Sequence, residues 1–98
     1  MRKVIIPNAL WSKIYEIKKY LIFDLKLSEE AAELRIERME NFINSLSNPV
    51  DYALCRFKRW RAKGYRCAVF ENSWIFAYEI FDEGVIIQDM AHGTALIE

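Results

Sequence analysis

The chain has 98 residues and a formal net charge of zero at pH 7, and apolar residues make up 53% of it. This length suits one small domain, and this apolar fraction excludes a disordered chain. We therefore expect a single domain over residues 1–98. No apolar run approaches the length of a membrane span, and the start of the chain has too few apolar residues for a secretion signal. The expectation is a soluble cytoplasmic protein that contacts no membrane.

The first half of the chain predicts a strand followed by two helices. Residues 3–6 form a short β-branched run, and Asn8 is a candidate N-cap for the segment that follows. Apolar residues at helical spacing predict one helix over residues 9–23 and a second over residues 29–45, with Ser28 as its N-cap. The short link between the two helices indicates a helical hairpin.

The second half changes to the patterns of β-strands. Strands are predicted over residues 65–70, 74–81 and 85–90, separated by short polar turns, and a further strand is expected within residues 52–60. The whole order predicts an α+β fold. It has an N-terminal strand, a two-helix hairpin and then an antiparallel β-meander, with the helices packed on one face of the sheet.

Cys55 and Cys67 are the only cysteines. No CxxC spacing and no Cys/His cluster accompany them, so we expect no zinc site, and nothing in the sequence calls for another metal or a cofactor. Two buried thiols in a reducing compartment are the favoured interpretation. A disulfide between the two cysteines remains open.

The distribution of charge is more distinctive than its total. Residues 56–66 hold six basic side chains and no acidic one, and they include Phe57, Trp60 and Tyr65; no Lys or Arg follows this segment. Guanidinium and ammonium groups bind phosphate oxygens, and aromatic faces stack on bases, so the segment suits a polyanionic or acidic partner. A solvated sheet edge explains the same pattern equally well, and Trp60 fits a core anchor as well as a stacking platform.

Several local sequences, in this order, resemble those of one protein family. Residues 45–49 read Ser-Leu-Ser-Asn-Pro at a helix end, and residues 59–66 read Arg-Trp-Arg-Ala-Lys-Gly-Tyr-Arg before a strand. Residues 74–80 read Trp-Ile-Phe-Ala-Tyr-Glu-Ile, and residues 86–93 end a strand in His-Gly. The ordered set covers nearly the whole chain and resembles the RelE/ParE superfamily of toxin–antitoxin toxins.

The resemblance implies the toxin of a type II toxin–antitoxin system, with a cognate antitoxin as its partner. RelE-like toxins are ribosome-dependent endoribonucleases that cut messenger RNA, whereas ParE-like toxins poison DNA gyrase. The alternative is a catalytically inactive member that only binds its antitoxin. Since one fold hosts these different functions, the fold alone does not decide between them.

If the chain is a metal-independent endoribonuclease, it needs a base, an acid and cations around one phosphate. The candidates are Arg66, Arg61, Lys63 and His92, and the alternation of Tyr65 and Cys67 to the opposite face of the sheet would leave Arg66 with the other cations. His92 is also explained as a structural residue at a strand end. The expected binding residues are Arg56, Lys58, Arg59, Trp60 and Tyr78, although core packing is the default for Tyr78.

The chain departs from the RelE pattern at two cationic positions. Ile75 stands where that pattern has an arginine, and Thr94 and Ala95 follow Gly93 where a second arginine is usual. The end of the chain is closer to the ParE pattern, although it also lacks an arginine that ParE-like ends usually have. Residues 56–66 are therefore better supported as a contact surface than as a catalytic centre.

Overall fold

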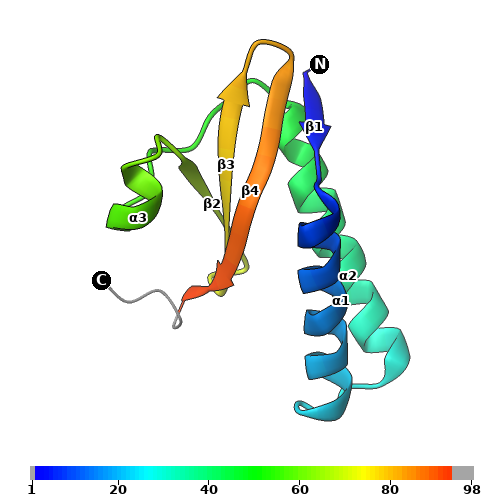
Figure 1. Cartoon of the computed structure of the whole chain (residues 1–98). Helices are drawn as coiled ribbons and strands as arrows, with labels where there is room; N and C mark the ends of the chain where they lie inside the picture. The colour runs from blue at the N-terminus through cyan, green and yellow to red at the C-terminus, as the bar shows by residue number, and fades with distance from the viewer. Residues whose placement is uncertain (1, 94–98) are drawn as a thin grey trace.

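The computed structural model describes residues 2–93 and has an α+β fold built on a mixed four-stranded sheet (Figure 1). Its elements are β1 (Lys3–Ile5), α1 (Asn8–Phe23), α2 (Glu29–Asn44), the 3₁₀ turn η1 (Ser45–Ser47), α3 (Lys58–Arg61), β2 (Arg66–Phe70), β3 (Trp74–Phe81) and β4 (Gly84–His92). The strand order is β1-β4-β3-β2, with β1 parallel to β4 and the other neighbours antiparallel. The predicted strand, helical hairpin and meander are confirmed.

The main core lies between the helical hairpin and one face of the sheet. Helix α1 buries Leu10, Ile14, Ile17 and Leu21, which recur every three or four residues and therefore share one helical face. They pack with residues of α2 and with sheet residues such as Phe76. The expectation that the two helices cover one face of the sheet is confirmed.

One of the two predicted helix caps is confirmed. The Ser28 hydroxyl accepts a hydrogen bond from the Ala31 amide at 3.1 Å, as an N-cap should. The Asn8 prediction is wrong: Pro7 occupies the cap position of α1, and Asn8 is the first helical residue. The Pro7 backbone is extended, and its carbonyl accepts the amides of Leu10 and Trp11, so backbone geometry alone starts this helix.

The further strand expected within residues 52–60 is not formed. This part of the chain is a loop with one isolated β-bridge, Leu54 to Arg66, followed by the short helix α3. Phe57 and Trp60 are three residues apart, so one helical turn brings their rings into an edge-to-face contact with centroids 5.9 Å apart. Trp60 is only 2% exposed as a result.

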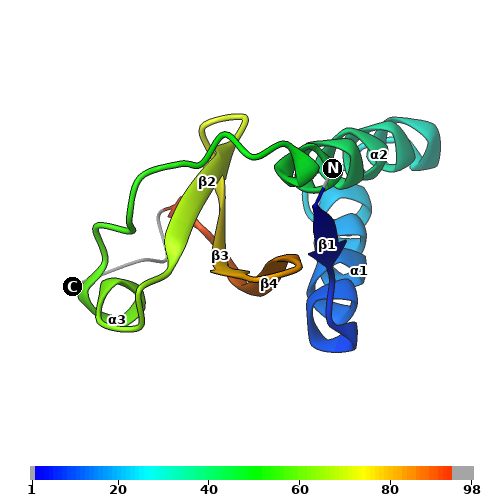
Figure 2. The ribbon, with the colours of Figure 1, turned by 90° about the horizontal axis from the view of Figure 1, so that it is seen from above.

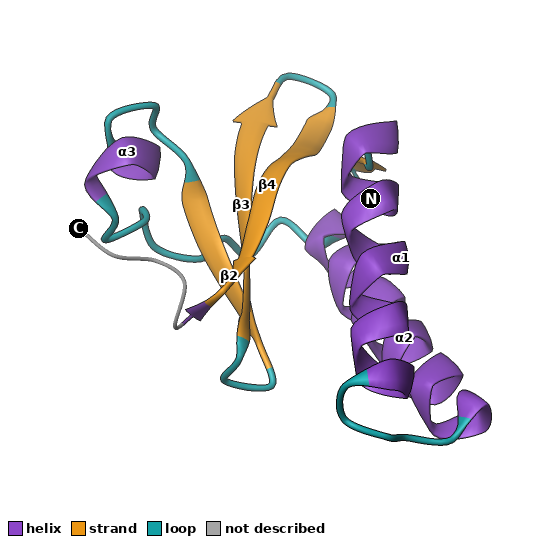
Figure 3. Cartoon of the chain, turned by 60° about the horizontal axis from the view of Figure 1, so that its bottom comes forward, coloured by secondary structure: helices purple, strands orange, loops and turns teal. Residues whose placement is uncertain are grey.

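Helix α3 lies on the sheet face opposite to α1 and α2 (Figure 2). The chain leaves η1 on the hairpin side and passes the outer edge of β2 before it enters α3 (Figure 3). A second, smaller core forms there from Cys55, Trp60 and Ala77, with Phe57, Tyr65, Cys67, Ile75 and Ala91 packed against it. The molecule therefore has three layers.

A disulfide joins Cys55 to Cys67, which corrects the expectation of two reduced thiols. The Cys55 amide donates to the Tyr65 carbonyl, and the Cys67 amide donates to the Ala53 carbonyl. This local antiparallel pairing brings the two Cα atoms within 4.9 Å of each other, a separation at which a disulfide forms readily.

No helix within residues 2–93 is long and apolar enough to cross a membrane.

Candidate functional site

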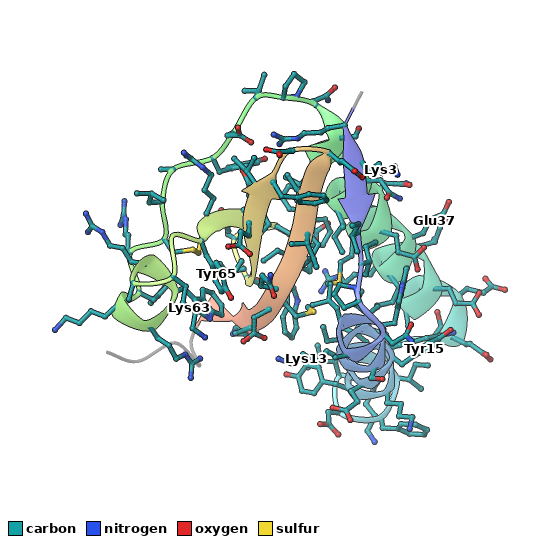
Figure 4. The ribbon with its side chains drawn as sticks, turned by 45° about the horizontal axis from the view of Figure 1, so that its top comes forward. Lys3, Lys13, Tyr15, Glu37, Lys63 and Tyr65 are labelled. Carbon is teal, nitrogen blue, oxygen red and sulfur yellow. A yellow bond between two sulfur atoms is a disulfide. The ribbon has the colours of Figure 1, made fainter. Side chains whose placement is uncertain are left out.

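Five cations surround α3 and form what we call the α3 cationic surface: Arg56, Lys58, Arg59, Arg61 and Lys63. All five are exposed, because Trp60 takes the inward side of the helix and leaves the outward sides to its neighbours. Figure 4 shows Lys63 beside α3, on the other side of the molecule from Tyr15 and Glu37 of the helical hairpin. The structure thus brings together five of the six basic residues of the segment.

Three arginines of this surface make no ion pair with the described part of the chain. Within residues 2–93, Arg56, Arg59 and Arg61 make no ion pair, whereas six other ion pairs form elsewhere in that range. The Lys63 ammonium lies 5.8 Å from the centre of the Tyr65 ring, within range of a cation–π contact. These cations are therefore positioned to bind phosphate or carboxylate groups of another molecule.

The base of this surface is held firmly. The amides of Arg61 and Ala62 close the helical turn onto the carbonyls of Phe57 and Lys58, at 2.8 Å and 2.9 Å. Gly64 then turns the chain into β2 with φ of +76°, a conformation that glycine adopts without strain. Backbone hydrogen bonds and the buried Trp60 thus contribute to holding the short helix that carries three of these cations.

Arg66 lies apart from these cations, contrary to the expectation. Tyr65 and Cys67 do point to the opposite face from Arg66, but that face is the one α3 covers. Arg66 pairs across the sheet with Tyr78, which packs in the main core beneath the helices. The prediction that Arg66 faces away from Tyr65 and Cys67 is correct. Because α3 covers the face of Tyr65 and Cys67, however, Arg66 is separated from the other cations instead of joining them.

Arg66 instead belongs to a polar group that we call the Tyr78 cluster. The Tyr78 hydroxyl accepts a hydrogen bond from the Tyr52 amide at 2.9 Å and donates one to Asp51 Oδ1 at 3.4 Å. Asp51 Oδ1 also accepts from Arg2 Nη2 at 2.6 Å, and Arg66 Nη1 donates to the Tyr52 carbonyl at 2.7 Å. The cluster joins the N-terminus, the loop after α2 and the strands β2 and β3.

Two groups of this cluster titrate away from their ordinary values. The hydrogen bond from Arg2 lowers the pKa of Asp51, and the charges of Arg2 and Arg66 add to this effect against the opposing effect of burial. Burial raises the pKa of Tyr78, which is 0% exposed. At neutral pH the cluster therefore contains a charged carboxylate and a neutral phenol, an arrangement that stabilises the loop.

His92 lies at a third location. It pairs with Trp74 across the sheet, and the two rings are perpendicular with centroids 4.9 Å apart. Arg66 pairs with Tyr78, four residues further along β3. Strand rise and strand spacing place the backbones of Arg66 and His92 roughly 16 Å apart. The four candidate catalytic residues thus lie in three places, with Arg61 and Lys63 on the α3 side of the sheet.

Arg2 and Asp51 are the cluster residues that sequence reasoning missed. They are far apart along the chain, and neither lies in a recognisable motif. Only the approach of the N-terminus to the loop after α2, where Arg2 Nε also donates to the Leu46 carbonyl, brings them together.

Among residues 2–93, no group of three or more His, Cys, Asp or Glu side chains is arranged to hold a metal ion.

A comparison of the chain with protein families, curated proteins and solved structures finds no match. Thr94 and Ala95, which follow Gly93 where the RelE pattern has an arginine, lie outside the described part of the chain.

Proposed function

We propose that this chain is the toxin of a type II toxin–antitoxin system, with a RelE/ParE-like fold, and that the α3 cationic surface contacts its target. The observation that carries the proposal is the gathering of five exposed cations on and beside a short helix that Trp60 and a disulfide hold in place. The order of strand, two helices and meander supports the proposed fold. An exposed cationic surface on a neutral protein suits a local contact with a polyanion or an acidic protein surface.

The arrangement favours inhibition by contact, as for a gyrase poison, over cleavage of messenger RNA. Cleavage without a metal needs a base, an acid and cations around the same phosphate, within hydrogen-bond reach. Arg66 is occupied in the Tyr78 cluster, His92 lies against Trp74, and Arg61 projects from the other side of the sheet. Binding through the α3 cationic surface requires none of them to converge.

A cognate antitoxin is the expected inhibitor. Its carboxylates would neutralise the α3 cationic surface and so compete with the target for the same cations. The inexpensive test is to co-express the reading frame next to this gene and to ask whether its product co-purifies with this chain. If no small neighbouring protein is retained, the toxin assignment loses its main support.

The target is tested by induced expression in bacteria. We expect growth arrest with a DNA damage response and trapped gyrase, and we expect Arg59→Ala with Arg61→Ala to relieve it at least tenfold in plating efficiency. The matched control, Lys3→Ala with Lys19→Ala, removes two exposed cations elsewhere and should leave the arrest unchanged.

The other outcomes decide against inhibition by contact. Arrest with messenger RNA cut on ribosomes, relieved by Arg66→Ala or His92→Ala, would establish the endoribonuclease instead. An equal loss of toxicity in both double variants would show that total charge matters and the α3 cationic surface does not. No arrest from a well-folded chain would favour the inactive, antitoxin-binding member of the family.

A further inference from the structure

The two cysteines stand directly on either side of the basic segment, Cys55 before Arg56 and Cys67 after Arg66. Their disulfide closes the whole segment into a ring anchored on the sheet. We propose that this disulfide is a redox switch that fixes or releases the α3 cationic surface. The link to target binding rests on the proposed function, whereas the release of α3 does not.

Besides the disulfide, the ring is held by the Arg66 side chain, which donates to the Tyr52 carbonyl, by backbone pairing and by the second core. The backbone pairing beside the disulfide consists of two hydrogen bonds, from the Cys55 amide to Tyr65 at 2.9 Å and from the Cys67 amide to Ala53 at 3.2 Å. The remaining anchor is the second core, which has three buried residues, one of them Cys55 itself. Opening the disulfide would therefore remove the only covalent link among these anchors and restore freedom to the chain that carries the cations.

The two cysteines differ in their exposure to solvent. Cys55 is 1% exposed, whereas Cys67 is partly exposed and lines a groove of about 370 Å³ beside the edge of β2. Arg56 also lines this groove, so its charge attracts an anionic thiolate. We therefore expect a reducing thiolate to attack at Cys67 rather than at Cys55.

The chemistry is an ordinary thiol–disulfide exchange with a dithiol as the reductant. The thiolate of the dithiol attacks Cys67 Sγ, a mixed disulfide forms there, and the Cys55 sulfur leaves with the electron pair and takes up a proton. The second thiol of the reductant then attacks the mixed disulfide and frees Cys67. Two electrons and two protons pass to the protein, and the dithiol becomes a disulfide.

The change is expected to remain local. The main core contains neither cysteine and no residue of α3, so the helical hairpin and its sheet face keep their packing when the disulfide opens. Loop-closure entropy for a ring of this size corresponds to roughly a hundredfold change in the local opening equilibrium. Reduction should thus loosen α3 without unfolding the molecule.

The test is amide hydrogen exchange on the full chain, oxidised and then reduced with dithiothreitol under native conditions. The Arg61 and Cys67 amides should exchange roughly a hundredfold faster after reduction, while amides of α1 such as Ile14 stay unchanged. The double variant Cys55→Ala with Cys67→Ala should show the exchange rates of the reduced protein, and dithiothreitol should not change them. Unchanged exchange on reduction, equal acceleration in α1, or a disulfide that resists native reduction would each overturn the switch.

A second measurement separates the switch from the proposed function. The oxidised chain should bind a labelled single-stranded RNA oligonucleotide at low salt about tenfold more tightly than the reduced chain, because a fixed surface loses less entropy on binding. Equal binding by both forms would overturn control of the surface by the disulfide. No binding by either form would count against the polyanion contact, and the exchange data would still decide the switch.

Discussion

Tyr78 is buried beneath the helices, yet its hydroxyl is shared between Asp51 and the Tyr52 amide. A buried hydroxyl without partners would destabilise the core, and a buried phenolate would do so more strongly. The loop after α2 provides both partners, and Arg2 holds Asp51 in place. One residue of β3 therefore fixes the path that leads the chain towards α3.

We predict that Tyr78→Phe lowers the free energy of unfolding by about 1–2 kcal/mol at pH 7, because two hydrogen bonds are lost. The mutation should also remove part of the alkaline sensitivity of the protein. The folded pKa of Tyr78 is raised, so its contribution is fully present below the ordinary value of about 10 and is lost as pH rises through the folded value. Urea unfolding between pH 7 and 11 measures both effects.

Tyr15→Phe is the matched control, because Tyr15 is 66% exposed and the mutation removes a hydroxyl from the surface rather than from the core. It should leave both the stability at pH 7 and the alkaline slope as in the unmodified chain. If the two phenylalanine variants have the same alkaline slope, burial of Tyr78 is not the source of that sensitivity.

Strand β1 depends on a close approach of two backbones. Lys3 pairs with Gly84, and a Cβ atom at position 84 would lie only 2.1 Å from the Lys3 carbonyl oxygen. Gly84→Ala should therefore displace β1 from β4 and cost about 2–3 kcal/mol, with loss of protection at the Lys3 amide, which donates to Glu83. Urea unfolding and amide exchange provide the two measurements.

Gly64→Ala provides the comparison. Its φ is +76°, but an added Cβ meets nothing within 4 Å, so only backbone strain of about 1 kcal/mol is expected. The Lys3 amide should stay protected in this variant. Comparable exchange at Lys3 in the two alanine variants would show that the backbone approach at Gly84 is not what holds β1.

The helices α1 and α2 were predictable because their signal is local. The spacing of Leu10, Ile14, Ile17 and Leu21 defines one apolar helical face, and this pattern does not depend on the rest of the chain. Helix α3 was not predictable in the same way, because four residues within a run of cations give no periodicity to detect. Its position on the second face of the sheet is set by tertiary contacts of Trp60, and no local stretch of sequence contains those contacts.

The site was predictable only in its composition. The cations of residues 56–66 are visible in the sequence, but the face on which each lies depends on which face of the sheet α3 packs against. The disulfide depends on the register of Leu54 against Arg66, and the Tyr78 cluster depends on the approach of Arg2 to Asp51. Each of these is a contact between distant segments, and no spacing along the chain encodes it.

At the scale of the whole molecule, the sheet combines local and distant pairings. The meander from β2 to β4 joins neighbours in sequence, whereas β1 pairs with β4 across nearly the whole chain. Closing such a long loop is entropically unfavourable, so β1 should dock after the transition state for folding.

Val4→Ala tests this order, since Val4 pairs with Val85 and packs against the main core. We expect a loss of roughly 1–2 kcal/mol that appears almost entirely as faster unfolding in stopped-flow measurements. Phe76→Leu, in the hairpin of β2 and β3, should instead slow folding. A clear decrease in the folding rate of Val4→Ala would place β1 in the early structure.

The separation of the two cores has a consequence for how such a protein can diverge. The cations of α3 rest on a small set of residues that contribute little to the main core. Substitutions on this outer layer change what the surface meets without disturbing the hairpin or its side of the sheet. Mutations at one face of the sheet can therefore change which partners the protein binds, while the core on the other face preserves the fold.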